Sequence, residues 1–276
     1  MKRILVPIDF SIQAECAIHT AAKIAKENGS DVHLLHMIDL PTNVDDLESH
    51  ADASSPAKIL FLKKVHKKIK KIMLSDTLKG VKTFEEVRFH KTFSGILEYS
   101  KELDVDLIVM GSNGTKDSFK EMFIGSNTEK VVRNSNVPVL VVKKGMGQFD
   151  MKKMVFATDF SEKIKPAFSR FLEFAKKFDA SIDLLYINTP RNFQSTKKIS
   201  QKIYDFLTEF DLPEHSLNIY NDKTIEKGIL NYSDDADVDV IVMVTHQRSG
   251  ISSLFNDSIS EDLVNHSPKP VLTFKI

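Results

Sequence analysis

The stretch MKRILVPIDFS at residues 1–11 returns as MKKMVFATDFS at residues 151–161, and this repetition decides the fold. Three later pairs of segments also match: SGILEYS from residue 94 with KGILNYS from 227, DVDLIVMG from 104 with DVDVIVMV from 237, and PVL from 138 with PVL from 270. The offset is 150 residues at the start (151 − 1), 133 in the middle (237 − 104) and 132 at the end (270 − 138). The chain is therefore two copies of one domain, with predicted boundaries at 1–146 and 150–276.

Within each copy, short aliphatic runs alternate with longer segments of helical spacing. In the first copy they predict strands at residues 4–6, 32–37, 81–88, 107–110 and 139–142, and helices at 12–28, 57–74, 96–103 and 128–133. Strands separated by helices indicate a parallel sheet covered on both faces, and right-handed crossovers favour a doubly wound order. The expected fold class is α/β, with two tandem doubly wound five-stranded parallel sheets.

Composition and charge exclude several classes of function. The 38 basic residues equal the 38 acidic ones, so no overall field would recruit nucleic acid or an anionic membrane. The single cysteine, Cys16, excludes an intrachain disulfide and suits a reducing cytosol. No stretch approaches the roughly 20 apolar residues of a spanning helix. We therefore expect a cytoplasmic protein with neither a nucleic-acid nor a membrane partner.

Two features of the first copy meet at the carboxyl ends of its predicted strands, where such sheets bind ligands. Asp9 lies just past the first strand and can accept hydrogen bonds, and Gly111 lies just past the fourth. The glycines at Gly111 and Gly114 let backbone N–H groups approach a phosphate. Gly125-Ser126-Asn127 then opens a helix, whose first N–H groups favour an anion. The alternative is that these glycines only shape turns and Ser126 only caps the helix. The local pattern leaves both interpretations open.

Other constellations are weaker. The sequence contains no G-x4-G-K-[ST] loop, and no G-x-G-x-x-G follows the first strand. His33 and His36 are three apart on a predicted strand, so their side chains point to opposite faces and cannot share a metal. The lysines between residues 58 and 71 are interleaved with Ile59 and other aliphatic residues, which favours the solvated face of a helix. No catalytic residue, metal site or dedicated enzymatic activity is expected.

Four segments resemble the universal stress proteins in a tandem two-domain form. They are ILVPIDFS from residue 4, LLHMID from 34, GSNG from 111 with GSNTEKVV from 125, and NVPVLVVK from 136. The resemblance covers essentially the whole chain. It implies an open sheet of five parallel strands of the Rossmann-like, adenine nucleotide alpha hydrolase-like kind. It also implies a G-x2-G-x9-G-[ST] loop, which holds ATP phosphates in the nucleotide-binding members of the family.

Carried over to this chain, the resemblance implies a site for ATP, alone or with Mg²⁺, in the first copy. It puts Pro7, Asp9 and the backbone of Met37 near adenine and ribose. The residues it puts around the phosphates are Met110, Gly111, Gly114, Gly125, Ser126 and Asn127. In the second copy Val244, Gln247 and Asp257 stand where the glycines would fall, so no site is expected there.

The first copy departs from the family loop in one respect. Ten residues, 115–124, separate Gly114 from Gly125, where the motif has nine. The offset between the copies falls from 133 at Gly111 to 132 at Pro138, so the first copy is one residue longer in this loop. The extra residue either bulges outward or displaces Gly125.

The resemblance also implies how the copies associate. Domains of this family pair through their last strands, so residues 139–142 and 271–274 are expected to lie antiparallel in an intrachain pseudo-dimer. Whole chains could pair further into a homodimer. The resulting hypothesis is a stress-response protein that binds an adenine nucleotide and acts as a regulatory module on an unidentified protein partner. The alternative is an interaction protein of the same fold that binds no nucleotide.

Overall fold

A computed structural model of the chain describes residues 1–39, 56–112, 126–143, 146, 150–245 and 257–276. The chain forms two compact units, Met1–Val109 and Met110–Ile276. These units divide the chain earlier than the sequence repeat does. The reason is that the strand closing the first copy pairs inside the second unit, as described below.

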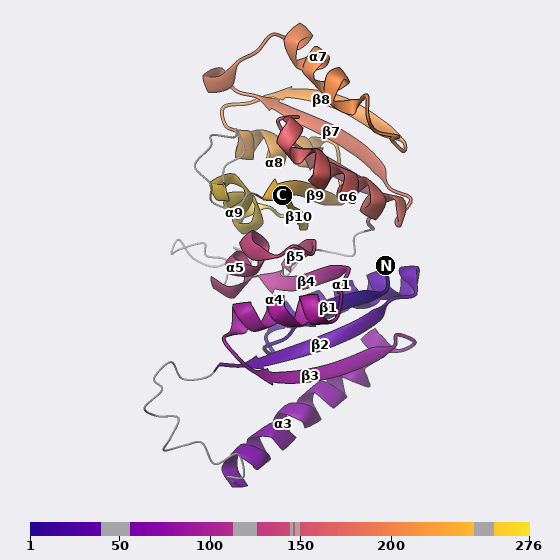
Figure 1. Ribbon diagram of the computed structural model, residues 1–276, viewed down its shortest axis with the longest axis vertical. Coiled ribbons are helices and arrows are strands. Elements are labelled where there is room, and N and C mark those ends of the chain that lie inside the picture. The colour runs from indigo at the N-terminus through magenta and orange to yellow at the C-terminus, as the bar shows by residue number, and fades with distance from the viewer. Residues whose placement is uncertain (40–55, 113–125, 144–145, 147–149, 246–256) are drawn as a thin grey trace. The chain divides into compact units, whose positions relative to one another are not determined.

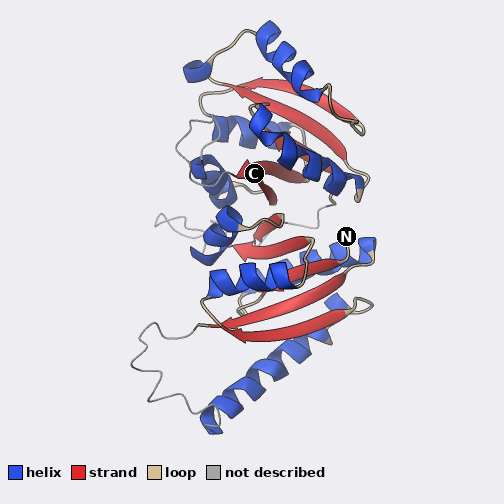
Figure 2. Ribbon diagram, in the orientation of Figure 1, coloured by secondary structure: helices blue, strands red, loops and turns tan. Residues whose placement is uncertain are grey.

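The first unit alternates strands with helices, as the sequence predicts (Figures 1 and 2). Its elements are β1 (Arg3–Pro7), α1 (Ile12–Asn28), β2 (Asp31–Ile38), α3 (Pro56–Met73), the 3-10 turn η2 (Asp76–Leu78), β3 (Thr83–Phe89), α4 (Thr92–Glu102) and the first part of β4 (Leu107–Ser112). The strands run parallel in the order β3-β2-β1-β4. Helices α1 and α4 lie on opposite faces of this sheet, which is the doubly wound arrangement (Figure 1).

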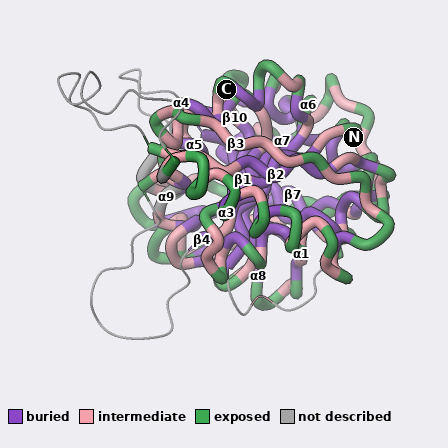
Figure 3. Tube along the Cα trace, turned by 90° about the horizontal axis from the view of Figure 1, so that it is seen from below, coloured by how far each residue is buried: buried purple, intermediate pink, exposed green. Residues whose placement is uncertain are grey.

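The apolar runs form the core of the first unit. Ile4, Leu5 and Val6 are fully buried, and Val6 lies opposite Leu34 in the parallel register of β1 with β2. The buried class in Figure 3 follows the strands and the inward sides of the helices. Helix α1 begins where the Ser11 hydroxyl accepts a hydrogen bond from the Ala14 N–H at 3.2 Å, and it ends at Gly29, whose φ is +64°.

The helix predicted at residues 57–74 is confirmed as α3, and its aliphatic residues differ in exposure along its length. Val65 and Ile69 of α3 are buried, as an inward row should be, but Ile59 is 43% exposed. The row of aliphatic residues therefore does not stay on the packed face toward the amino end of the helix.

The second unit contains the remaining elements. They are α5 (Ser126–Asn134), β5 (Val139–Lys143), β6 (Lys153–Ala157), η3 (Glu162–Ile164), α6 (Lys165–Lys176), β7 (Ser181–Asn188), η4 (Pro190–Asn192), α7 (Thr196–Leu207), β8 (His215–Asn221), α8 (Ile225–Asp235), β9 (Val240–Thr245), α9 (Asp257–His266) and β10 (Val271–Lys275). The strand order is β5-β10-β9-β6-β7-β8. Among the described residues of this sheet, β5 and β10 pair antiparallel and the other strand pairs are parallel.

The final strands of the two copies pair antiparallel, which confirms the predicted pseudo-dimer contact. Leu140 lies opposite Leu272, and Val139 and Val141 lie opposite Thr273 and Val271. Since Leu272 is Leu140 plus 132, equivalent residues face each other about a local two-fold axis at this pair. We call the β5–β10 pair the seam. It explains why residues from Met110 onward belong to the second unit.

Two lysines at the ends of the seam strands donate hydrogen bonds to the last helices of the two copies. Lys143 at the end of β5 is buried, and its Nζ donates to the main-chain oxygens of Asn265 at 2.5 Å and Ser267 at 2.9 Å, at the carboxyl end of α9. Lys275 is its equivalent in the second copy (143 + 132), and its Nζ donates to Asn134 O at 3.0 Å, at the end of α5. Each copy thus supplies a cation to the carboxyl end of the other copy's last helix, where the helix dipole favours it.

Candidate functional site

The loop after β1 is a tight turn built around Asp9. The Asp9 Oδ1 atom accepts a hydrogen bond from the Ser11 N–H at 2.9 Å, and Phe10 between them has a φ of +65°. A positive φ is uncommon for a residue with a large side chain and often marks a functional loop. Asp9 is exposed, and its Oδ2 has no partner among the described residues. One carboxylate oxygen therefore holds the turn and the other faces solvent.

The ring of Phe10 fixes this turn against β2 and α3. Its centroid lies 4.7 Å from that of the His36 ring, and the Lys68 ammonium lies 4.9 Å from it. The Nδ1 atom of His36 lies 2.8 Å from Ile8 O, so this nitrogen carries the proton and donates. The Phe10 ring and the His36 hydrogen bond thus hold the turn from two sides.

Met37 occupies the end of β2, as the sequence requires, and its side chain packs on α4. An added Cβ at Gly95 would lie 2.2 Å from Met37 Cε, so a larger residue there would force the flexible tip of Met37 to move. The second copy repeats the contact: a Cβ at Gly228 would lie 2.7 Å from Ile187 Cγ2. The glycine that SGILEYS and KGILNYS share therefore has a packing role that the sequence did not reveal.

These two glycines provide a matched pair for a stability test. Gly228→Ala should cost about 2 kcal/mol of unfolding free energy, because Ile187 is β-branched and buried and cannot turn away. Gly95→Ala should cost at least about 1 kcal/mol less, because the Met37 tip is flexible and alanine favours the helix. Urea unfolding of both variants measures the difference. A larger loss at Gly95 would contradict this account of the packing.

The predicted phosphate-binding residues begin at the end of β4, in the second unit. Met110 is buried, Gly111 is half-buried, and the hydroxyl of the buried Ser112 has no hydrogen-bond partner among the described residues. The Thr128 hydroxyl of α5 points to Gly111 O at 3.5 Å, the outer limit of a hydrogen bond. A buried hydroxyl without a partner costs stability, so Ser112 is suited to accept or donate to a bound group.

Three of the remaining predicted residues, Pro7, Ser126 and Asn127, lie at the ends of described elements. Ser126 opens α5 and is exposed, and Asn127 follows it, half-buried, so the predicted helix start is confirmed. Pro7 ends β1 opposite Leu35. Gly114 and Gly125 lie outside the described residues, as does the longer loop between them. Strands β1 and β4 run parallel, with Leu5 opposite Ile108, so the chain leaves both at the same edge of the sheet.

The equivalent loop of the second copy has the same backbone but a different environment. Asp159 Oδ1 accepts from the Ser161 N–H at 3.0 Å, and Phe160 has a φ of +53°. Asp159, however, is only 8% exposed. It lies beside the buried Tyr186, whose pKa is raised by burial and by the charge of Asp159. The turn is kept, but its carboxylate no longer faces solvent.

Large side chains close this second loop. Val244 occupies the place of Gly111 and is buried, and Thr245 occupies that of Ser112. The Phe160 ring packs edge-on against Phe206 of α7 at a centroid distance of 5.5 Å. The loss of a phosphate-binding backbone in this copy stays a prediction, since it was made from Val244 and Gln247 in the sequence, and Gln247 lies outside the described residues. Asp257 is the first residue of α9, at the position aligned with Gly125.

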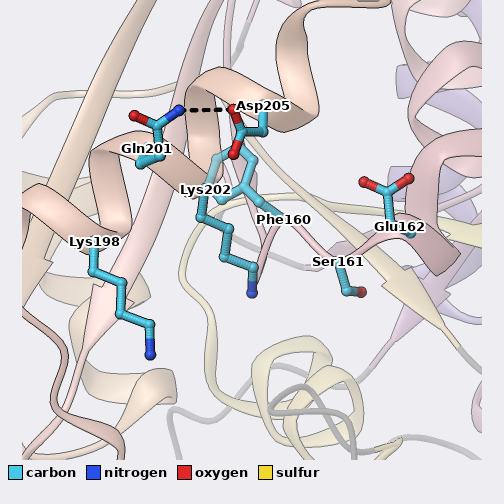
Figure 4. A pocket seen from close by; sticks show the side chains of 7 residues that line it. All are labelled: Phe160, Ser161, Glu162, Lys198, Gln201, Lys202 and Asp205. Atoms are coloured by element: carbon cyan, nitrogen blue, oxygen red, sulfur yellow. Dashed lines mark hydrogen bonds between the residues drawn. The ribbon is translucent and has the colours of Figure 1, made fainter.

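A hollow of about 400 Å³ lies between the second loop and α7. It is lined by Phe160, Ser161, Glu162, Lys198, Gln201, Lys202 and Asp205. In Figure 4 Lys198 and Lys202 project to the same side of the helix, while the Gln201 amide donates to Asp205 at 2.8 Å. None of the residues predicted to bind nucleotide lines it, so this hollow is separate from the predicted site.

The described ranges contain neither a cluster of metal-ligating side chains nor a helix that could span a membrane. Among those residues no three His, Cys, Asp or Glu side chains gather closely enough to hold a metal ion. No described helix combines the length and apolar character needed to cross a membrane.

The chain belongs to the universal stress protein family, whose model matches residues 1–143 and again 151–275. Universal stress protein Slr1230 of Synechocystis is 26% identical over 306 aligned positions that cover 100% of both chains. Universal stress protein MJ0531 of Methanocaldococcus jannaschii is 32% identical over 144 residues, 52% of this chain and 82% of that protein. The crystal structure of a universal stress protein from Archaeoglobus fulgidus superposes with a TM-score of 0.74 at 20% identity, covering 99% of this chain and 98% of that one, which shows a shared fold.

Proposed function

We propose that the first copy binds an adenine nucleotide, ATP alone or with Mg²⁺, and that the protein acts as a regulatory module on a partner protein rather than as an enzyme. Asp9 and the backbone of Met37 would hold adenine and ribose. Gly111, Ser112 and the opening of α5 at Ser126 would hold phosphates. A cytoplasmic location belongs to the same proposal.

The contrast between the two Asp-Phe-Ser turns carries this proposal. Both turns use one carboxylate oxygen to bind the backbone at close to 3 Å. Only Asp9 has its second oxygen in solvent, since Asp159 is buried beside Tyr186. Only the first copy has a glycine at the end of its fourth strand, where the second has the buried Val244. The same turn geometry with unequal exposure of the carboxylate supports a ligand site in the first copy only.

Asp9→Asn and Asp159→Asn form the matched test. Asparagine keeps an oxygen that can accept from the Ser11 or Ser161 N–H, so neither turn should be lost. At position 9 the solvent-facing acceptor becomes an amide donor, and ATP affinity should fall about tenfold, as expected for a hydrogen bond to a charged group. At position 159 the affinity should stay within about twofold. A fluorescent ATP analogue displaced by unlabelled ATP measures both.

The alternative function is an interaction protein of this fold that binds no nucleotide. Purified protein that releases no ultraviolet-absorbing nucleotide on denaturation, and that shows no ATP binding in the displacement assay, would favour it. Equal losses in the two aspartate variants would also count against the proposed site.

A further inference from the structure

Helix α3 of the first unit carries an unbalanced charge. Its 18 residues, PAKILFLKKVHKKIKKIM, contain seven lysines and no aspartate or glutamate. The chain as a whole is neutral, so this local excess is hidden in the overall composition. Helix α7, the equivalent helix of the second copy, has three lysines in 12 residues and also an aspartate. The excess of positive charge is therefore a feature of the first copy and is not shared by the equivalent helix of the second.

Five of these lysines are exposed and form no ion pair with any described residue. We call Lys63, Lys64, Lys67, Lys70 and Lys71 the basic face. Lys58 and Lys68 lie over the rings of Phe89 and Phe10, and His66 pairs with Glu85 at 3.4 Å. No lysine of the basic face has an acidic partner among the described residues. Val65 and Ile69 are buried on the opposite side, so the basic face points away from the sheet.

Exposed apolar side chains adjoin the basic face at the amino end of α3. Ile59 is 43% exposed, Leu60 55% and Phe61 47%. Leaving three consecutive apolar side chains about half exposed to water is energetically unfavourable. These side chains lie within one helical turn of Lys63 and Lys64. Cationic side chains beside exposed leucine and phenylalanine are typical of helices that lie in the plane of a membrane interface.

We propose that this surface, the basic face with Ile59, Leu60 and Phe61, docks on an anionic lipid surface. The lysines would meet the headgroups, and the apolar residues would enter the boundary with the acyl chains. A nucleic acid would use the lysines but leave Leu60 and Phe61 without a partner. The helix also has no arginine for bidentate contacts and no Ser, Thr, Asn or Gln for polar ones. The charge density keeps α3 on the surface and rules out insertion across the membrane.

The test uses the full chain and vesicles of phosphatidylcholine with and without about one-third phosphatidylserine. We expect sedimentation with the anionic vesicles only, weakened at least tenfold when salt rises from about 50 to about 300 mM. Replacing Lys63, Lys64, Lys67 and Lys71 by glutamine should weaken binding at least about 50-fold, since each lysine near such a surface contributes roughly fivefold. Leu60→Ser with Phe61→Ser should weaken it about tenfold. All six positions are exposed, and circular dichroism should show an unchanged fold.

Helix α7 provides the control. Replacing Lys197, Lys198 and Lys202 by glutamine removes surface lysines from the equivalent helix and should change vesicle binding less than about twofold. Absence of binding to the anionic vesicles, or equal losses from the α3 and α7 variants, would overturn the proposal. So would tighter binding to a single-stranded oligonucleotide that the Leu60→Ser and Phe61→Ser changes leave unaltered, which would assign the basic face to nucleic acid.

Discussion

Titration of the full chain with ATP is expected to give one site per chain, and Gly125→Asp is expected to abolish it. Residue 125 directly precedes Ser126, the first residue of α5, and the resemblance assigns both residues to the phosphates. Two like charges about 4 Å apart repel by roughly 1 kcal/mol even in water, and by more when partly desolvated. A nucleotide carries several phosphate charges, so the repulsion adds up. The affinity of the variant for ATP should therefore be too weak for titration calorimetry to detect.

The second copy contains the matching change in its natural sequence. Asp257 is the first residue of α9 and stands where Gly125 aligns. Asp257→Ala should therefore leave the stoichiometry at one, because Val244 still replaces the glycine at the end of β9 and Asp159 remains buried. Two equivalent sites in the wild type, or a site that survives Gly125→Asp, would show that the ligand has been assigned to the wrong copy.

The second large effect is expected at Lys143 in alkaline solution. Burial lowers the pKa of this amine from its ordinary value of 10.5 to about 8. Below pH 8 the amine is charged in both states, and the folded protein bears the full cost of its desolvation. Between pH 8 and 10.5 the unfolded chain binds more protons than the folded one. The free energy of unfolding therefore increases as pH rises through this range.

Lys143→Met removes this dependence. At neutral pH the variant loses two hydrogen bonds to the end of α9 but also an unfavourable buried charge, so we expect a small net change. The stability difference between wild type and variant should then be about 2 kcal/mol larger at roughly pH 9.5 than at roughly pH 7. Urea unfolding at the two pH values measures it. Tyrosines with raised pKa values affect both proteins alike, so the comparison cancels them.

Lys177→Met controls for the loss of one positive charge, since that side chain is exposed in the same unit. Its unfolding free energy should follow the wild type across the alkaline range. A constant difference between wild type and Lys143→Met would mean that the buried amine stays charged, and the account of its burial would then be wrong.

Much of the fold could be predicted because it depends on local periodicity. Strands and helices of the first copy begin and end within a few residues of their predicted positions, with β3 at Thr83–Phe89 against a predicted 81–88 and α3 at Pro56–Met73 against 57–74. The seam was predicted from the resemblance to a family whose domains pair through their last strands, and the structure confirms the antiparallel pair.

What could not be predicted depends on contacts between distant segments. The glycine of SGILEYS repeats in KGILNYS, but only the structure shows that Met37 and Ile187 press on these positions. Lys143 repeats as Lys275, but the helix end that each one meets belongs to the other copy. Asp9 and Asp159 share one motif. Their different exposure comes from neighbours such as Tyr186, which no local pattern specifies.

The seam has a consequence for how the two copies can change over time. In a dimer of identical chains, any substitution at such a contact appears twice and must suit both halves. Here Thr273 donates its hydroxyl to Val139 O at 3.3 Å, while its equivalent across the axis, Val141, has no hydroxyl to donate. In a tandem chain the two sides of such a contact are encoded separately, so one side can differ from the other, as Thr273 differs from Val141. The covalent link keeps the partner at a high effective concentration, which leaves either copy free to take on a separate task.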